Sequence, residues 1–349
     1  MTEIITPSLE HYDVDTSTDI RTALWMEHGF SRREIGALML EADADLEILS
    51  SERQPLTGTL ALPFPIAKTP DAIETINRTA EQHGIDAIWV QNSALYDLSG
   101  IVPRVHAAAT PDVIRLVDDK IAFTQWLGND PHRPDATLTI GSEQVAKEYY
   151  RRSANGQEVC IKPVVGVNGG GYWRLNPHAN ASFLNDPTER EIHPEVYFTA
   201  LAKAEQEAPA RQMIVMDYLP GPEVSVDVLS WEGRPLSHAA RTKVKGTQEF
   251  QHIDSEHPTI GHAYRTIGSL SMHGIVSVQY RLDAESDWKI LEINPRPAGG
   301  SIHSERAGFG IISGWTKLVT GKVSPDDIKQ HNGHTVLEMK RTAHVVSER

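Results

Sequence analysis

The segment KILEINPRPAGG, residues 289–300, restricts the possible folds of this chain more than any other stretch. Its apolar residues predict a strand, and side chains two residues apart on a strand point to the same face. Glu292 and Asn294 therefore share one face, while Leu291 and Ile293 are expected on the other. A carboxylate and an amide oxygen on one face are ligands of the kind that Mg²⁺ takes.

A second predicted strand, residues 277–282, supplies a third oxygen donor. If it pairs with the first strand as a hairpin, Gln279 lies opposite the face that carries Glu292 and Asn294. Arg296, just beyond the hairpin, is a cation suited to a phosphate or a carboxylate. The alternative is an ordinary polar outer face. Apolar residues on both faces favour a buried strand instead, in which polar side chains need partners.

The composition excludes several classes of protein. The chain has 349 residues, of which 40% are hydrophobic and 23% are charged, so it is globular, with a length that suits two or three domains. A net charge of −14 disfavours nucleic-acid and anionic-membrane partners. The single cysteine, Cys160, leaves no intramolecular disulfide. We see no signal peptide and no stretch of roughly 20 apolar residues, so we expect a cytoplasmic protein.

The first third of the chain predicts alternating helices and strands, which is typical of an α/β layer. Apolar spacing predicts helices over 18–48, 70–83 and 111–127, a buried strand over 86–90, and a strand or loop over 59–66.

The rest of the chain predicts a small α+β unit followed by two hairpins. Residues 128–216 carry a strand over 158–166, a glycine run, a helix over 193–208 and a strand over 211–219. Strands over 223–230 and 233–244, a helix ending near Gly274, and the hairpin that carries Gln279 follow.

Lys162 and the glycine run form one candidate site. A lysine in a buried strand is costly unless its charge is used. Gly169, Gly170 and Gly171 let the backbone approach a ligand closely, and their N–H groups suit phosphate oxygens. The alternative is a strand-end lysine that reaches solvent before an ordinary turn.

The segment MDYLPGPEVSVDV offers a second candidate. Backbone groups of Asp217, Tyr218 and Leu219 suit an adenine edge, and Glu223 suits ribose hydroxyls because a carboxylate is a strong acceptor. The alternative interpretation of this segment is a hairpin turn that carries acidic residues at the surface.

Further cations complete the set. Arg241 and Lys243 are two residues apart on one predicted strand, so they share a face and make a local positive patch. Solvated cations on an edge strand are common, however. Lys120 begins a predicted helix and is otherwise an ordinary surface lysine. The chain contains no P-loop, no G-x-G-x-x-G after a strand and no H-E-x-x-H, which argues against P-loop, Rossmann and zinc-hydrolase sites.

Taken in order, these segments resemble the ATP-grasp superfamily. The resemblance rests on Asp119-Lys120, CIKPVVGVNGGG, MDYLPGPEVSVDV, and the Gln279 strand followed by LEINPRPAGG, and it covers about residues 118–312. The LEINPR ending is more similar to carbamoyl-phosphate synthetase, biotin carboxylase and carboxylate–amine ligases than to D-alanine–D-alanine ligases.

The resemblance implies a role for each candidate residue. Lys120 and Lys162 would hold ATP phosphates under a flap of Gly169, Gly170 and Gly171. Asp217, Tyr218 and Leu219 would meet adenine, with Glu223 at the ribose. The metal, Mg²⁺ or Mn²⁺ in its place, would be bound by Gln279, Glu292 and Asn294. The catalytic cations would be Arg241, Lys243 and Arg296.

The resemblance also implies an α/β and α+β architecture, the ATP-grasp fold. We expect an N-terminal α/β domain (residues 1–118), a small lid (119–216) and a C-terminal antiparallel-sheet domain (217–349). Residues 1–60 show neither the apolar strand nor the glycine turn with which such a first domain usually opens.

The implied activity is an ATP-dependent ligase that converts a carboxylate into an acyl phosphate, which an amine then attacks. The partners would be a small carboxylate and an amine. The sequence does not give the oligomeric state, although homodimers are common among such folds. Two alternatives stay open: an ATP-grasp kinase that phosphorylates a small molecule, and a nucleotide-binding regulatory protein without turnover.

Overall fold

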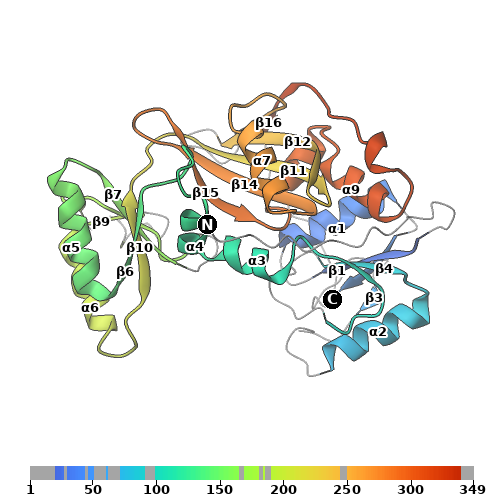
Figure 1. Ribbon diagram of the computed structural model, residues 1–349, viewed down its shortest axis with the longest axis horizontal. Coiled ribbons are helices and arrows are strands. Elements are labelled where there is room, and N and C mark those ends of the chain that lie inside the picture. The colour runs from blue at the N-terminus through green and yellow to red at the C-terminus, as the bar shows by residue number, and fades with distance from the viewer. Residues whose placement is uncertain are drawn as a thin grey trace, which may run out of the picture.

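The computed structural model describes residues 20–26, 30–43, 46–50, 60–61, 71–90, 99–164, 169–180, 184, 190–243 and 250–338. These residues form three sheets (Figure 1). A parallel sheet lies at one end of the molecule and a small sheet with two helices at the other, with a large antiparallel sheet between them. In the described part of the chain, no helix combines the length and the apolar character needed to cross a membrane.

The first sheet is entirely parallel, with strand order β3-β2-β1-β4-β5. Its strands are β1 (Thr22–Met26), β2 (Glu47–Ser50), β3 (Leu60–Ala61), β4 (Ala87–Val90) and β5 (Arg104–His106). Helix α1 (Phe30–Ala42) packs toward the large sheet, and α2 (Ala72–His83) covers the other face. Gly84 ends α2 in the left-handed conformation, as a C-terminal glycine commonly does.

One prediction for this region is wrong. The single helix expected over 18–48 is a strand, a helix and a second strand, and β1 is the apolar opening strand that we thought absent. Ala23 and Leu24 of β1 and Ile48 and Leu49 of β2 are buried, and the two strands pair in parallel, so tertiary contacts override the helical spacing read from the sequence.

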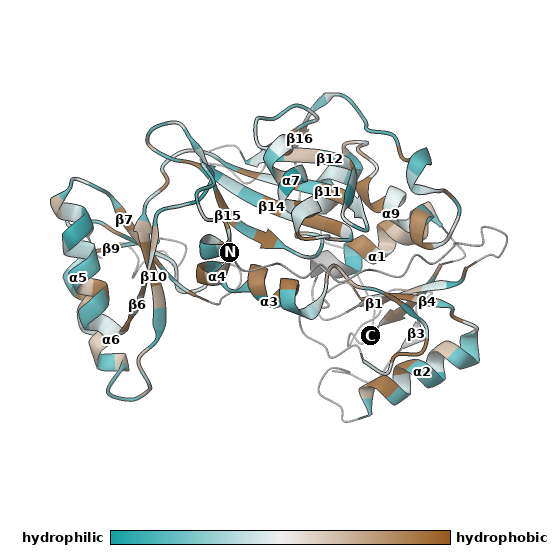
Figure 2. Cartoon of the chain, in the orientation of Figure 1, coloured by the Kyte–Doolittle hydropathy of each residue, from teal (hydrophilic) through white to brown (hydrophobic). Residues whose placement is uncertain are grey.

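The small sheet, which we call the lid, has strand order β6-β10-β7-β8-β9. Its elements are β6 (Ala136–Ile140), α5 (Gly141–Ala154), β7 (Val159–Pro163), β8 (Trp173–Leu175), β9 (Glu191–Ile192), α6 (Pro194–Ala204) and β10 (Gln212–Asp217). Helices α5 and α6 bury one face of this sheet. Figure 2 shows hydrophilic and hydrophobic stretches on α5, as expected of a helix with one face on a sheet and one in solvent.

The large sheet has strand order β15-β14-β11-β12-β13-β16, with every pair antiparallel. Its strands are β11 (Glu223–Trp231), β12 (Arg234–Lys243), β13 (Phe250–Asp254), β14 (Gly274–Leu282), β15 (Trp288–Asn294) and β16 (His334–Glu338). Helix α7 (Ile260–Ser269) covers one face, and α8 (Ser301–Arg306), α9 (Ile311–Val319) and a 3-10 turn (Pro325–Asp327) follow β15. Both predicted hairpins are confirmed.

Two short helices join the sheets. The helix expected over 111–127 is α3 (Pro111–Asp118) and α4 (Lys120–Trp126), separated by Asp119 in an extended conformation. Figure 1 shows α4 between the lid and the large sheet. The sheets thus confirm an α/β first region and an antiparallel last one. The domain boundaries after residues 118 and 216 stay a prediction.

Candidate active site

Direct pairing across four strands puts the predicted polar residues in one row. Glu292 of β15 pairs with Gln279 of β14, Gln279 with Ser225 of β11, and Ser225 with Arg241 of β12. Directly opposite residues in an antiparallel sheet point to the same face, with Cβ atoms about 4.5–5.5 Å apart. Glu292, Gln279 and Arg241 therefore share one face of the large sheet, which we call the site face.

A second row on the site face holds Asn294, Ser277 and Asp227, again in register. The Asn294 amide Nδ2 donates a hydrogen bond to Oε1 of Glu292 at 3.2 Å. Ser277 Oγ is buried and has no hydrogen-bond partner among the described residues. A buried hydroxyl beside a carboxylate and two amides is a donor set that suits a hard cation or a polar substrate group.

A bulge in β15 corrects one expectation. Glu292 and Ile290 pair with consecutive residues of β14, so Leu291 between them is an extra residue. Ile290 and Ile293 pack into the cluster under α7, whereas Leu291 joins an apolar cluster that faces the lid. The prediction that Leu291 and Ile293 share a face is therefore wrong, because a bulge re-aims the side chains on one side of it.

Lys162 lies on the face of the lid sheet that is turned away from its helices. Its neighbour Ile161 belongs to the core under α5 and α6, so the alternation of a strand directs Lys162 to the opposite face. Cys160, two residues earlier, lies on that same face in the apolar cluster that includes Leu291 of β15. Lys162 consequently faces the large sheet.

Electrostatic effects place three predicted residues near one another. Burial lowers the pKa of half-buried Lys162, the ammonium group of Lys120 lowers it further, and the Glu292 carboxylate raises it. Charges act in this way only over short distances. Lys120 from α4 and Glu292 from the large sheet are therefore both within electrostatic range of Lys162 from the lid.

The start of α4 fixes the position of Lys120. The Asp119 carboxylate accepts hydrogen bonds from the backbone N–H groups of Ile121 and Ala122, both at 2.9 Å, and so caps the helix. Lys120 is the first residue after this cap. Ile121, the next residue, packs into the apolar cluster with Cys160 and Leu291.

Arg241 is held by an ion pair that the sequence reasoning missed. Its Nε donates to Oδ2 of Asp227 at 2.7 Å, and Nη2 donates to Oδ1 at 3.2 Å. The hydroxyls of Ser301 and Ser304 donate to the same carboxylate at 3.0 and 2.7 Å. A Cβ on Gly300 would lie 2.1 Å from Nη1 of Arg241, so only glycine leaves room for the guanidinium.

Two other predicted cations have partners in this state. Lys243 donates to Oε1 of Glu223 at 2.5 Å, and about half of its side chain is exposed. Arg296 is half-buried, and its Nη1 donates to the carbonyl of Pro297 at 3.1 Å. Glu223 pairs across the sheet with Arg281, a further cation on the site face that the sequence did not single out.

The three residues predicted to meet adenine, Asp217, Tyr218 and Leu219, have different surroundings. The Asp217 carboxylate accepts from Arg152 Nη1 at 2.6 Å and from Gln157 Nε2 at 2.8 Å, so its side chain is engaged by lid residues. Leu219 is buried in the apolar cluster with Leu291. These apolar side chains suit a flat purine ring.

The ring of Tyr218 lies against two guanidinium groups. Its centroid is 4.4 Å from Cζ of Arg174 and 5.4 Å from Cζ of Arg281. These cation–π contacts connect the lid to the large sheet at this residue.

The three glycines form a turn before β8. Tyr172 N–H donates to the carbonyl of Gly169 at 3.1 Å, and Gly169 and Gly171 both have positive φ. A Cβ on Gly171 would lie 2.8 Å from Cγ of Pro163, so this turn packs closely on the end of β7. The role of these glycines as a flap stays a prediction, since residues 165–168 lie outside the described part.

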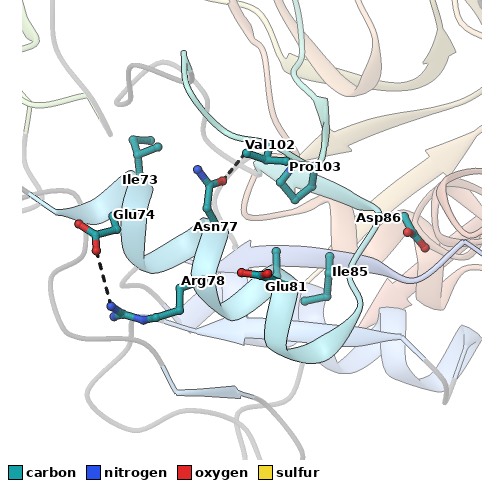
Figure 3. Close-up of a pocket in the computed structure, with 10 residues that line it drawn as sticks. Ile73, Glu74, Asn77, Arg78, Glu81, Ile85, Asp86, Val102 and Pro103 are labelled. Atoms are coloured by element: carbon teal, nitrogen blue, oxygen red, sulfur yellow. Dashed lines mark hydrogen bonds and ion pairs between the residues drawn. The ribbon is translucent and has the colours of Figure 1, made fainter.

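A separate hollow of about 910 Å³ lies along α2 in the first sheet region (Figure 3). Asn77 Oδ1 accepts from the backbone N–H of Val102 at 2.9 Å, and Glu74 pairs with Arg78. Its lining holds three carboxylates and one arginine, which does not suit a triphosphate.

Comparisons with known proteins bear on the fold. Residues 209–342 match the family model described as "ATP-grasp in the biosynthetic pathway with Ter operon". No curated protein sequence matches the chain.

Several solved structures share the fold. N5-carboxyaminoimidazole synthetase from Staphylococcus aureus, complexed with ADP, superposes with a TM-score of 0.62 at 13% identity, covering 88% of this chain and 78% of that one. Biotin carboxylase from Campylobacter jejuni superposes with a TM-score of 0.60 at 17% identity, covering 91% of this chain and 75% of that one. L-amino acid ligase from Bacillus licheniformis superposes with a TM-score of 0.59 at 12% identity, covering 89% of this chain and 77% of that one. The chain has the ATP-grasp fold, as predicted.

Proposed function

We propose that this chain, an ATP-grasp protein by fold, is an ATP-dependent ligase that activates a carboxylate and joins it to an amine. The observation that carries the proposal is that Lys162 is within electrostatic range of both Lys120 and Glu292, and that Glu292 is paired with Gln279. Two ammonium groups facing oxygen donors suit a triphosphate with its metal. The match to the ATP-grasp family model and the fold shared with N5-carboxyaminoimidazole synthetase and L-amino acid ligase add support.

Each predicted residue has a role in this proposal. Lys120 and Lys162 hold triphosphate oxygens, and Gly169, Gly170 and Gly171 cover them. The apolar cluster around Leu219 and Leu291 takes the adenine with backbone groups of Asp217 and Tyr218, and Glu223 takes the ribose hydroxyls.

The metal site would consist of Gln279, Glu292 and Asn294. These residues fit a magnesium ion because they offer hard oxygen atoms on one face. The buried hydroxyl of Ser277, which has no partner among the residues that the structure describes, lies in the same row as Asn294. A bound Mg²⁺ would neutralise charge on the transferred phosphoryl group.

The reaction needs positioning more than covalent help from the protein. A substrate carboxylate oxygen attacks the γ-phosphorus, the bond to the β,γ-bridging oxygen breaks, and ADP leaves. The amine nitrogen then attacks the acyl carbon, phosphate leaves, and the nitrogen loses a proton. Arg241, Lys243 and Arg296 would steady the phosphoryl group and the substrate carboxylate, and the lid would exclude water from the acyl phosphate.

An ADP-release screen tests the proposal. The full chain with Mg·ATP is incubated with amino acids and small carboxylates, alone and in pairs, and products are identified by mass spectrometry. Ligation gives ADP, free phosphate and an amide, and hydroxylamine traps the acyl phosphate as a hydroxamate.

Other results would contradict it. A stable phosphorylated product would show the kinase alternative instead. Thermal stabilisation by Mg·ATP without ADP formation from any substrate would favour the regulatory alternative. Glu292→Gln, which removes one charge with little change of shape, is the matched control for contaminating ATPases.

A further inference from the structure

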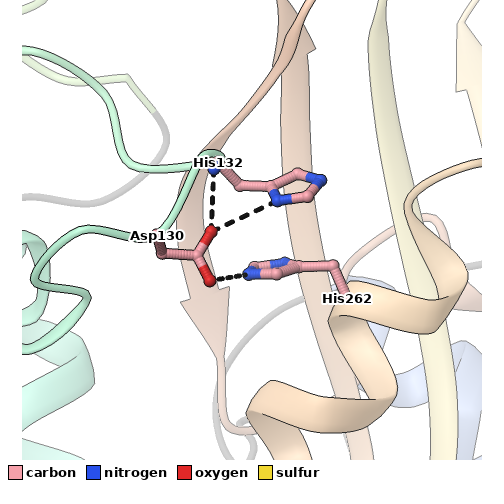
Figure 4. Close-up of side chains that lie close together, drawn as sticks. All are labelled: Asp130, His132 and His262. Carbon is pink, nitrogen blue, oxygen red and sulfur yellow. Dashed lines mark hydrogen bonds and ion pairs between the residues drawn. The ribbon is translucent and has the colours of Figure 1, made fainter.

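Three side chains gather away from the site face, at the base of the lid (Figure 4). Asp130 Oδ1 lies 3.2 Å from Nδ1 of His132, and its Oδ2 lies 3.3 Å from Nε2 of His262. The two imidazole rings stack with centroids 4.0 Å apart. One ligand atom from each of the three residues lies within 4.8 Å of the other two.

This cluster is distinct from the nucleotide site. Asp130 and His132 lie between α4 and β6, in the segment that enters the lid, whereas His262 lies on α7. Nδ1 of His262 is 2.7 Å from the hydroxyl of Tyr280, which belongs to the core under α7. Because Tyr280 follows Gln279 on β14, its side chain points to the face opposite the site face.

The three side chains form a pre-arranged donor set. Figure 4 shows one nitrogen of each imidazole directed at the Asp130 carboxylate, so two nitrogens and an oxygen face one small volume. The second nitrogen of His262 is held by Tyr280, as metal-bound imidazoles are commonly held through their outer nitrogen. His262 is 2% exposed, while His132 and Asp130 are 21% and 29% exposed, so the cluster is anchored on one side and reachable from the other.

We propose that Asp130, His132 and His262 bind a divalent transition-metal ion, Zn²⁺ in the first instance. Two imidazoles and one carboxylate with a water molecule make a four-coordinate site of the kind zinc takes. Imidazole ligands select zinc, cobalt or nickel over magnesium, so the site would not compete for the Mg²⁺ of the nucleotide site. The ion would replace the two imidazole–carboxylate hydrogen bonds and tie the lid's entering segment to α7.

Metal titration of the full chain tests this assignment. The protein is stripped with a chelator, dialysed, and titrated with Zn²⁺ by calorimetry in excess Mg²⁺, and Co²⁺ is added separately to read the ligand set from its visible absorption. We expect one tight site per chain. His132→Ala removes one of the three ligands, and Asp130→Asn removes the negative charge of another. Each should weaken binding by about tenfold or more, since even changes to residues behind a metal ligand have effects of this size.

His238→Asn is the matched control. Nδ1 of His238 also contacts a tyrosine hydroxyl, that of Tyr264 at 2.7 Å, but its Nε2 faces the carbonyl of Ser255 and no carboxylate. This variant should bind Zn²⁺ as the parent chain does. The proposal is overturned if the parent chain binds no Zn²⁺ in excess Mg²⁺, or if the affinity and the cobalt spectrum are unchanged in both ligand variants. Circular dichroism of each variant checks that it is folded.

Discussion

Arg241 and Asp227 form a doubly hydrogen-bonded ion pair that is almost closed to solvent, with 3% and 0% of the side chains exposed. Removing one charge of a buried pair leaves the other uncompensated, which costs about 3–5 kcal/mol. We therefore expect Asp227→Asn to lower the free energy of unfolding by about this amount, measured by urea denaturation.

The double variant Asp227→Leu/Arg241→Met separates loss of charge from loss of packing. Replacing both partners of a buried pair with apolar residues is often close to neutral. We expect it to be more stable than Asp227→Asn and to have lost ADP release. Equal destabilisation in both variants would mean that the cost comes from packing and not from the stranded guanidinium.

Gly300 sets the space available to Arg241. Its added Cβ would lie 2.1 Å from Nη1 and 2.8 Å from Cζ, so Gly300→Ala must displace the guanidinium. We expect a loss of stability of about 1–3 kcal/mol, typical of overpacking, and a fall in kcat for ADP release.

Gly261→Ala is the control for Gly300→Ala. Gly261 lies in α7, where an added Cβ meets nothing closer than the Arg265 guanidinium at 3.6 Å. Alanine should be neutral or slightly stabilising there. If Gly300→Ala behaves in the same way, Arg241 is not confined as the distances indicate.

Lys162 and Glu292 carry the proposed chemistry from opposite sheets. We expect Lys162→Ala and Glu292→Ala each to lose on the order of 3 kcal/mol or more of transition-state stabilisation, by analogy with the loss of one preorganised electrostatic contact. Steady-state ADP release with the best substrate from the screen measures it. Near-normal turnover in either variant would remove that residue from the proposed machinery.

Much of the site was predictable because strand alternation is local. Glu292 and Asn294 fall on one face through alternation along β15 alone, and Gln279 joins them through the register of the hairpin. The same alternation on β7 determines which face of the lid sheet carries Lys162. The order of these segments then predicted the ATP-grasp fold, which the solved structures share.

The rest depends on contacts between distant residues. The bulge at Leu291 has no signal in the apolar pattern, since both neighbouring isoleucines keep their expected apolar character. Asp227 lies two residues after Ser225 on β11, and this spacing places it on the site face. Its partners Ser301 and Ser304 come from α8, which the strand pattern does not predict. In the first region, pairing between strands far apart in sequence decided against the single helix.

His273 predicts how stability depends on pH. Its Nδ1 accepts a hydrogen bond from the backbone N–H of Glu232 at 3.1 Å. A proton on Nδ1 would therefore bring two N–H groups face to face. Burial, together with the nearby Arg104, lowers its pKa from 6.5 to about 4.

Between these two values the unfolded chain binds more protons at this residue than the folded chain does. The free energy of unfolding should therefore fall as the pH drops from 6.5 toward 4, by up to about 1.4 kcal/mol per pH unit, and this contribution should level off below 4. Asn in place of His273 does not titrate and keeps an oxygen that can accept the Glu232 N–H. Urea denaturation across this range should show a smaller decline for His273→Asn than for the parent chain, and parallel curves would contradict the assignment. The two curves should run parallel above about pH 8, separated only by a constant offset, because His273 is uncharged there in both the folded and the unfolded chain.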